Sequence, residues 1–347
     1  MAALAKVSGA AVSRYLNKKI TLPIATAHRI DQAVLKLEYR PNASALGLSK
    51  GRTDTVGLVT PNIANPFFAC LASAVEEEAA ALGYSTVLCS TRSLRQQELL
   101  HLDRLASKQV DGLIVMTNHG HDGTLFSKFP GHSRIVLLGE DVLGMNVPKV
   151  LFDNIDGGFK ATSYLISKGH TRIAHISGPE HLVSAQERFA GFRKACIEQR
   201  LSLDPSLLYF GTYSQSYGYE AMDALLSRPD PPTAVFAASD FIAIGILEAV
   251  QARGKNVPHD ISLVGFDDIP LSNLLNPPLT TIHLPIVELG KTAVRLLHAR
   301  IQDEPVPPAT VRFPVSLLER SSVSAPRKTP TLKVRRARSN GRKSSFS

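Results

Sequence analysis

The sequence contains no tryptophan and only three cysteines among 347 residues. Cys70, Cys89 and Cys196 are odd in number and far apart, which excludes a disulfide framework and a zinc-binding pair of neighbouring cysteines. We expect all three to be small buried hydrophobic residues. No run approaches the ~18 consecutive apolar residues of a membrane span, and the first residues lack a secretory signal pattern. The sequence therefore predicts a cytoplasmic protein with no membrane partner.

Sequence motifs of catalysis give no support for an enzyme. There is no phosphate-binding Gly-x-x-x-x-Gly-Lys-Ser/Thr and no Gly-x-Gly-x-x-Gly after a strand. One stretch, Gly47 to Gly51, has the Gly-x-Ser-x-Gly spacing, but it precedes the first predicted strand and so is no nucleophile elbow between a strand and a helix. His119, His121 and Asp122 lie close together in a glycine-containing stretch, but no further metal ligands stand nearby in the sequence. We therefore predict a protein that is not an enzyme, with no catalytic residue, no cofactor and no metal.

Positive charge is concentrated at the two ends of the chain, which has a net charge of +9. Residues 1–52 hold nine basic and two acidic residues, residues 324–347 hold eight basic and no acidic ones, and residues 53–323 hold 22 basic and 28 acidic ones. An anionic partner such as DNA would therefore bind an end rather than the acidic body. We expect 324–347 to be a disordered tail, acting either as solvated charge or as nonspecific attraction to phosphate.

From Thr55 onward, short apolar runs rich in β-branched residues alternate with helical patterns. The runs cover 55–60, 85–89, 112–116, 134–138, 149–152, 172–176, 234–238 and 261–266. Strands that are apolar throughout and separated by helices are typical of parallel sheets covered on both faces. We predict two doubly wound α/β subdomains within 53–323, with four and about five strands, and a break near Phe152.

Ligands of such sheets bind beyond the carboxyl ends of the strands, so residues at these positions are candidates. They are Asn62 to Phe68, Asp153, Asn154, Asp240, Asp267 and Asp268, together with Arg188 at the start of a helix. Aromatic faces, carboxylates and a guanidinium suit a polyhydroxylated ligand. Two alternatives stay open: Asp240 could cap the helix that begins at Phe241, and Phe67 and Phe68 could belong to the core.

The N-terminal segment reads as a helix-turn-helix. Residues 4–17 suggest the end of one helix, a turn and a second helix, and a third helix fits 24–37. Ser8 is a suitable N-cap of the second helix, and Ala11, Val12, Tyr15 and Leu16 provide its inward-facing side.

With these features, the chain resembles the lactose-repressor (LacI/GalR) family of bacterial transcription regulators over roughly residues 1–320. The ordered matches are Val7-Ser-x-x-x-Val-Ser-Arg-x-Leu-Asn17, Tyr39-Arg-Pro-Asn-Ala43, Gly51-Arg-Thr-x-Thr-Val-Gly57, Asn65-Pro-Phe-Phe68, Glu187-Arg-x-Ala-Gly-Phe192, Val264-Gly-Phe-Asp-Asp-Ile-Pro270 and Pro277-Pro-Leu-Thr-Thr-Ile282. The resemblance implies a periplasmic-binding-protein-like type I fold behind a helix-turn-helix headpiece (1–40) and a hinge helix with its linker (41–52).

The resemblance further implies a homodimer, or a higher oligomer, that binds palindromic operator DNA and represses transcription. The implied DNA contacts are Ser8, Gly9, Ala10, Ser13, Arg14, Asn17, Asn42 and Leu48. Among the residues that face base edges, only Arg14 can make a bidentate contact, as with guanine, whereas Ser8 and Ser13 suit phosphate. Leu48 matches the leucine that the family inserts into the minor groove.

For the effector pocket, the resemblance points to Phe67, Phe68, Arg188, Tyr213, Asp240 and His283. We predict a small effector, a sugar or sugar acid, that closes the cleft between the subdomains and thereby changes operator affinity. The alternatives are a sugar-binding module without DNA-dependent regulation, and an enzyme on the same scaffold.

The chain departs from the family pattern in its headpiece and hinge. The family carries further residues before the position of Met1, so we expect either a start upstream or a weakened first helix. Lys6 stands where the turn often has glycine, and Ala11 where threonine is usual. Gly47 lowers the helix propensity of the hinge by roughly 1 kcal/mol relative to alanine, which makes that helix more dependent on DNA.

Overall fold

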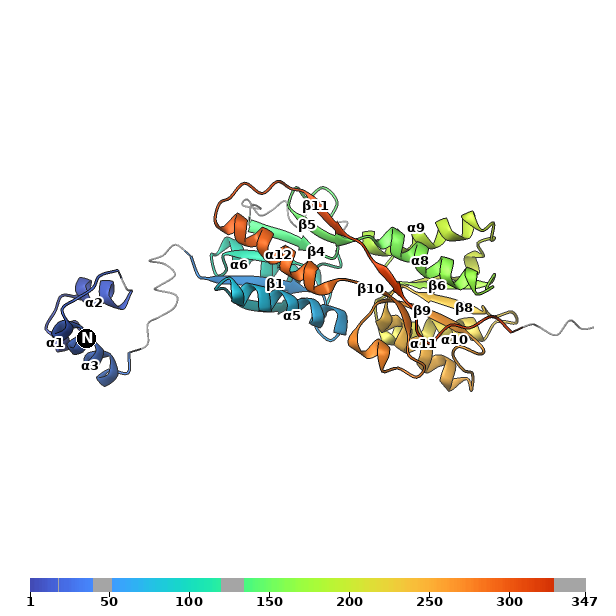
Figure 1. Ribbon diagram of the computed structural model, residues 1–347, viewed down its shortest axis with the longest axis horizontal. Helices are drawn as coiled ribbons and strands as arrows, with labels where there is room; N and C mark the ends of the chain where they lie inside the picture. The colour runs from blue at the N-terminus through green and yellow to red at the C-terminus, as the bar shows by residue number, and fades with distance from the viewer. Residues whose placement is uncertain (18, 40–51, 120–133, 328–347) are drawn as a thin grey trace, which may run out of the picture.

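The computed structural model describes residues 1–17, 19–39, 52–119 and 134–327 (Figure 1). The hinge segment with Asn42, Gly47 and Leu48, the residues His121 and Asp122, and the last twenty residues lie outside the described residues.

The headpiece consists of α1 (Ala2–Ala5), α2 (Gly9–Leu16) and α3 (Ile24–Lys36). Lys6 ends α1 with a left-handed φ of 53°, which explains why glycine would also suit this position. The Ser8 hydroxyl accepts a hydrogen bond from the backbone N–H of Ala11 at 3.1 Å, which confirms Ser8 as the N-cap of α2. The buried core of the three helices consists of Ala5, Val12, Ile30 and Ala33. The half-buried side chains of Tyr15 and Leu16 pack against this core, and Ala11 is half-buried as well.

The first subdomain is built on a six-stranded parallel sheet in the order β11-β5-β4-β3-β1-β2. Its strands are β1 (Thr55–Thr60), β2 (Ser85–Ser90), β3 (Gly112–Val115), β4 (Ile135–Leu138), β5 (Lys149–Phe152) and β11 (Thr310–Phe313). Its helices are α5 (Pro66–Ala81), α6 (Arg95–Ala106) and α12 (Ile286–Ile301), and α12 packs on α5, β3, β4 and β5. β3 and β4 are buried throughout, as expected for central parallel strands.

The second subdomain contains the other six-stranded sheet, in the order β12-β10-β9-β8-β6-β7. Its strands are β6 (Ile173–Ser177), β7 (Leu208–Phe210), β8 (Ala234–Ala237), β9 (Ser262–Asp267), β10 (Thr280–His283) and β12 (Ser316–Leu318). Among the described strands of this sheet, only β12 runs antiparallel to its neighbour. The helices are α8 (Asn154–Ser167), α9 (Val183–Glu198), α10 (Gln215–Leu226), α11 (Asp240–Ala252) and the 3-10 turns η2 (Pro205–Leu207) and η3 (Pro270–Asn273).

The chain passes between the two subdomains at three crossovers: β5 to α8, β10 to α12, and β11 to β12. The predicted pair of doubly wound sheets is confirmed, as is a break after Phe152. The predicted count of four and about five strands is wrong, because each sheet has six within the described residues. The missed strands β7, β10, β11 and β12 are three or four residues long. Unlike the equally short β3, β4 and β8, they include polar or tyrosine residues, so they do not stand out as apolar runs.

Two further expectations need correction. Cys89 and Cys196 are buried free thiols, but Cys70 is only half-buried. Residues 324–327 pack on the second subdomain rather than belonging to a free tail: Ser324 N–H donates to Ser262 Oγ at 3.0 Å, and Arg327 pairs with Asp260 at 2.7 Å. Within the described ranges, no helix is long and apolar enough to span a membrane, and no group of three or more His, Cys, Asp or Glu side chains could hold a metal ion.

Candidate effector cavity and DNA-binding helix

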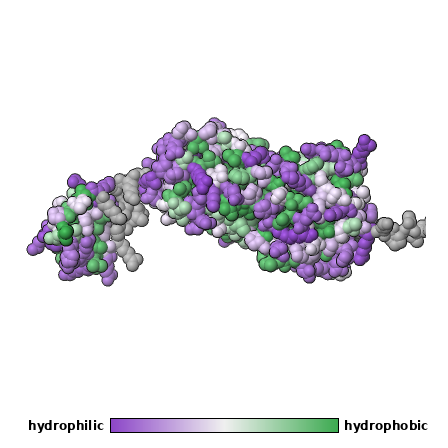
Figure 2. All heavy atoms as spheres, in the orientation of Figure 1, coloured by the Kyte–Doolittle hydropathy of each residue, from purple (hydrophilic) through white to green (hydrophobic). Residues whose placement is uncertain are grey.

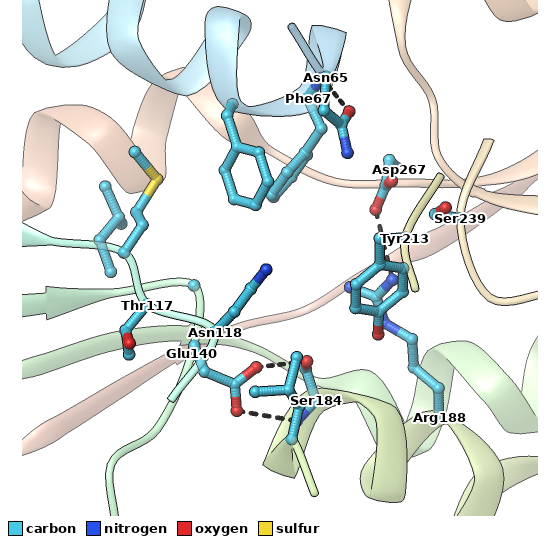
Figure 3. Close-up of a pocket in the computed structure, with 15 residues that line it drawn as sticks. Asn65, Phe67, Thr117, Asn118, Glu140, Ser184, Arg188, Tyr213, Ser239 and Asp267 are labelled. Carbon is cyan, nitrogen blue, oxygen red and sulfur yellow. Dashed lines mark hydrogen bonds and ion pairs between the residues drawn. The ribbon is translucent and has the colours of Figure 1, made fainter. Parts of the chain in front are cut away.

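A cavity with about 490 Å³ of empty space, part of it open to solvent, lies between the two subdomains (Figure 3). Its lining comes from both sheets: Asn65, Phe67, Phe68, Met116, Thr117, Asn118, Leu138, Gly139 and Glu140 from the first subdomain, and Leu182, Ser184, Arg188, Tyr213, Ser239 and Asp267 from the second. Most of these residues follow the carboxyl end of a strand or begin a helix, as expected for doubly wound sheets.

The first subdomain provides an aromatic wall. Asn65 caps α5 by accepting a hydrogen bond from the Phe67 N–H at 3.0 Å, and Pro66 occupies the first helical position. This start of the helix brings Phe67 and Phe68 to the cavity, with ring centroids 5.2 Å apart in an edge-to-face arrangement. The rings offer apolar surface to the C–H face of a ligand.

Arg188 lies on the opposite wall and is held by the protein on several sides. Its Nε donates to Asn154 Oδ1 at 2.9 Å, and its Nη1 lies 3.5 Å from Asp267 Oδ1. Its guanidinium carbon stands 3.8 Å from the centroid of the Phe266 ring. Burial raises the pKa of Asp267 well above its ordinary value, although the positive charge of Arg188 acts in the opposite direction. The pair offers hydrogen-bond donors and acceptors at a fixed place.

Glu140 and Ser184 connect the two walls directly. Glu140 follows β4 of the first subdomain, and Ser184 lies in the first turn of α9 in the second. The Ser184 N–H donates to Glu140 Oε1 at 3.1 Å, and its hydroxyl donates to Glu140 Oε2. Burial raises the pKa of Glu140 to about 7, and the two hydrogen bonds from Ser184 only partly oppose this shift.

Four of the six residues expected at the effector site line this cavity: Phe67, Phe68, Arg188 and Tyr213. Asp240 does not, because it is completely buried behind the cavity. Its Oδ1 accepts from the Thr281 hydroxyl at 2.6 Å, and its Oδ2 accepts from Ile269 N–H at 3.0 Å and the Ser272 hydroxyl at 2.5 Å. Asp240 therefore fixes the loop after β9 and leaves the proposed effector set.

His283 also leaves that set. Its side chain is about half exposed, and its Nδ1 lies 2.8 Å from Asp268 Oδ2, outside the cavity lining.

The alternative prediction for Asp240, that it caps the following helix, is also wrong. The cap of α11 is Ser239, whose hydroxyl accepts from the Ile242 N–H at 3.2 Å. Asp267, the last residue of β9, contributes to the cavity instead, at a left-handed φ of 111°.

Sequence reasoning missed Glu140 and Ser184. Glu140 had a usable signal, since it stands two residues beyond an apolar run at the carboxyl end of a strand. Ser184 had none, because its role depends on how the start of α9 meets the opposite subdomain.

Helix α2 carries the expected DNA contacts of the headpiece. Ser8, Gly9, Ala10, Ser13 and Arg14 are exposed, and Asn17 is half-buried with its amide 3.4 Å from the Ser13 hydroxyl. The Arg14 guanidinium has no hydrogen-bond or ion-pair partner within the described part of the chain, so it can bind an outside acceptor. An exposed helix of this kind is suited to the major groove.

Fold and site together define a class of protein: a two-lobed small-molecule-binding domain preceded by a helix-turn-helix. Comparison with known proteins makes this more specific. Residues 1–42 match the bacterial regulatory proteins of the lacI family, and residues 162–323 match the periplasmic binding protein-like domain.

Similarity to individual relatives extends over nearly the whole chain. It is 34% identical over 325 residues to the HTH-type transcriptional repressor PurR of Mannheimia succiniciproducens, covering 93% of this chain and 97% of that protein. It is 35% identical over 325 residues to the ribose operon repressor of Escherichia coli, covering 93% and 98%. The lac repressor dimer bound to operator is 27% identical with a TM-score of 0.80, covering 93% and 98%.

The chain belongs to the lacI family of bacterial regulatory proteins. It is a DNA-binding transcriptional regulator and not an enzyme.

Proposed function

We propose that this protein is a homodimeric repressor that inserts α2 into the major groove of a palindromic operator, and that a neutral sugar in the interlobe cavity controls its operator affinity. It acts in the cytoplasm, where its DNA target lies. One observation carries the effector assignment: a single cavity holds the Phe67 and Phe68 rings on one wall and a ring of hydrogen-bonding groups on the other. Flat apolar surface and convergent polar groups are the two features that sugar recognition needs.

The charges of the cavity favour a neutral sugar over a sugar acid. Arg188 already has an acidic neighbour in Asp267, and Glu140 adds a second carboxyl group to the lining. An anionic ligand would therefore meet two carboxyl groups and a guanidinium that already contacts one of them. Related structures support the class of ligand: CelR, 34% identical, is solved with cellobiose, and a lacI-family regulator of Enterococcus faecium, 29% identical, is solved with ribose.

Dimerisation through exposed leucines of the two subdomains completes the proposal. Leu88, Leu94, Leu271 and Leu274 are large apolar side chains on the surface, and Leu274 is 77% exposed. Figure 2 shows several green, hydrophobic patches on the visible face of the protein. Burying these leucines against a second copy of the chain would remove their apolar surface from water, which favours association.

Two experiments test the proposal. A thermal-shift screen of pentoses, hexoses, cellobiose, sugar acids and purines against the full chain should give a rise in Tm with neutral sugars, because a ligand at 100 times its Kd stabilises by about 2.7 kcal/mol. Selection of operators from random DNA, followed by gel shifts, should return a palindrome bound well above nonspecific DNA. Selection of no palindrome would refute operator binding, and a response to sugar acids or purines alone would refute the neutral-sugar assignment.

A further inference from the structure

A chain of hydrogen bonds leads from the cavity to the strand by which the polypeptide crosses between the lobes. Arg188 Nε donates to Asn154 Oδ1 at 2.9 Å, and Asn154 Nδ2 donates to Glu187 Oε2 at 3.1 Å. Glu187 in turn accepts from Arg312, with Oε1 2.9 Å from Nη2 and Oε2 3.3 Å from Nη1. This series of hydrogen bonds thus joins the Arg188 guanidinium in the cavity to the Arg312 guanidinium outside it.

The two ends of this series of hydrogen bonds, Arg188 and Arg312, belong to different subdomains. Arg188, Glu187 and Asn154 lie on α9 and α8 of the second subdomain. Arg312 lies on β11, where it pairs in register with Leu151 of β5 in the first sheet. Arg312 Nη1 also donates to the backbone oxygen of Phe152 at 3.3 Å, so its side chain reaches the other crossover, where β5 leads into α8.

The two middle residues of this series of hydrogen bonds, Asn154 and Glu187, leave Arg188 little freedom. Asn154 is 2% exposed and uses its oxygen toward Arg188 and its nitrogen toward Glu187, which fixes the orientation of the amide. Helices α8 and α9 pack so closely that a Cβ on Gly158 would stand 2.1 Å from the backbone oxygen of Arg188. A shift of Arg312 relative to α9 must therefore strain Glu187 and Asn154, or move the guanidinium in the cavity.

We propose that Asn154 and Glu187 are positioning residues for Arg188, and that their link to Arg312 couples the effector-binding guanidinium to movement of the crossover strand between the lobes. This inference rests on the proposed function, because it assigns a coupling path to the same cavity. Coupling between two sites requires an element whose arrangement both sites affect, and the crossover at β11 is such an element.

A purely structural role of the Glu187–Arg312 pair predicts a different effect of its loss than a role in positioning Arg188 does. The Glu187–Arg312 pair is partly open to solvent, with side chains 16% and 40% exposed, and such pairs contribute little to stability. If the pair were only a surface ion pair, its loss would change neither stability nor regulation. If it positions Arg188, its loss changes regulation without a matching change in stability.

The test compares full-length Glu187→Gln and Arg312→Gln with the matched control Arg253→Gln, which breaks the exposed Arg253–Asp223 pair on the second subdomain. D-ribose, D-glucose, D-galactose and cellobiose serve as probes. Sugar Kd is measured by calorimetry, operator Kd by fluorescence anisotropy with and without each sugar, and Tm by thermal melting. The ratio of the two operator Kd values is the coupling factor.

We expect Glu187→Gln and Arg312→Gln to lower the coupling factor at least about fivefold, with operator Kd in the absence of sugar and Tm close to those of the control. Arg312→Lys should restore part of the coupling, because it retains the positive charge. A coupling factor equal to that of the wild type in both Gln variants overturns the inference alone. If no probe changes the operator affinity of the wild type, the proposed function fails, and this inference fails with it.

Discussion

The backbone N–H and the hydroxyl of Ser184 both donate to the carboxyl group of Glu140, which belongs to the opposite subdomain. The contact joins the start of α9 to the end of β4 inside the cavity (Figure 3). Glu140 is 7% exposed, so its protonation state changes the energy of the contact between the lobes.

Glu140→Gln should flatten the dependence of stability on pH. The pKa of Glu140 is raised from 4.5 to about 7, so the folded state binds its proton more tightly than the unfolded state does. This contribution to stability is complete below pH 4.5 and is lost as the pH rises through 7. The wild type should therefore lose about 3 kcal/mol more than the variant between pH 4.5 and 7.5, at about 1.4 kcal/mol per unit.

Urea unfolding of both proteins across this range measures the difference. Asp240, with a pKa raised by burial to about 6, also loses stabilisation as the pH rises, and His175, with a pKa lowered by burial to about 3, acts in the opposite direction. Both groups are present in wild type and variant, so their contributions cancel in the comparison. Parallel pH profiles would contradict the assignment to Glu140.

Arg188→Ala should abolish the response to sugar while leaving operator binding intact. The guanidinium lines the cavity, whereas the DNA contacts lie on α2. The change therefore removes hydrogen bonds to the ligand and the contacts of Arg188 with Asn154 and Asp267, but no DNA contact. Gel shifts with and without sugar measure the response, and Arg253→Ala, on the exposed surface, is the matched control. Loss of operator binding together with the sugar response would show that the fold is broken or the cavity misassigned.

The sequence predicted the parts of the site that depend on local signals. Phe67 follows Asn65-Pro66, a recognisable helix start after a strand, and Arg188 lies in a family motif. Asp240 also stands just after a strand, β8, where ligand-binding residues are expected. Its side chain nevertheless points into the protein and is surrounded by hydroxyl and N–H donors from three later segments. Its partners come from 29 to 41 residues farther along the chain, which no local pattern reveals.

Strand assignment failed for a related reason. β10 and β11 are short, and what makes them strands is their partner: β11 pairs with β5, which lies far earlier in the sequence. The helix α12 is likewise near the C-terminus but packs on the first sheet. Pairings of this kind depend on tertiary contacts, not on the residues of the segment itself.

Gly158→Ala should destabilise the protein by about 2 kcal/mol, because the new Cβ would stand 2.1 Å from the Arg188 backbone oxygen and must push α8 and α9 apart. The same displacement moves Arg188, so sugar affinity should fall as well. Urea unfolding and calorimetry measure the two effects. Ser163→Ala, at a half-buried position of α8, is the control and should stay within about 0.5 kcal/mol of the wild type. Equal stability of the two variants would show that the helices can separate freely.

Arg14→Lys should relax operator specificity more than it weakens DNA binding overall. Lysine keeps the positive charge but cannot make the bidentate contact of a guanidinium with a guanine. We expect discrimination at one base pair of each half-site to fall by about 1–3 kcal/mol, measured by gel shifts over single-base operator variants. Lys6→Arg, at the exposed turn before α2, is the control. A uniform loss over all operator variants would instead identify Arg14 as a phosphate contact.

Two truncations separate the structural and electrostatic contributions of the C-terminal residues. Removing 328–347 deletes seven basic and no acidic residues, so nonspecific DNA affinity should fall and become less dependent on salt, while operator preference stays unchanged. Removing 324–347 also deletes Ser324, whose backbone oxygen lies 2.8 Å from His170 Nε2, and Arg327 with its ion pair to Asp260. Only this longer truncation should lower the Tm. Salt titrations of binding to random DNA, together with thermal melts, distinguish the two effects. An unchanged salt dependence after the shorter truncation would show that these charges are solvated and do not contact DNA.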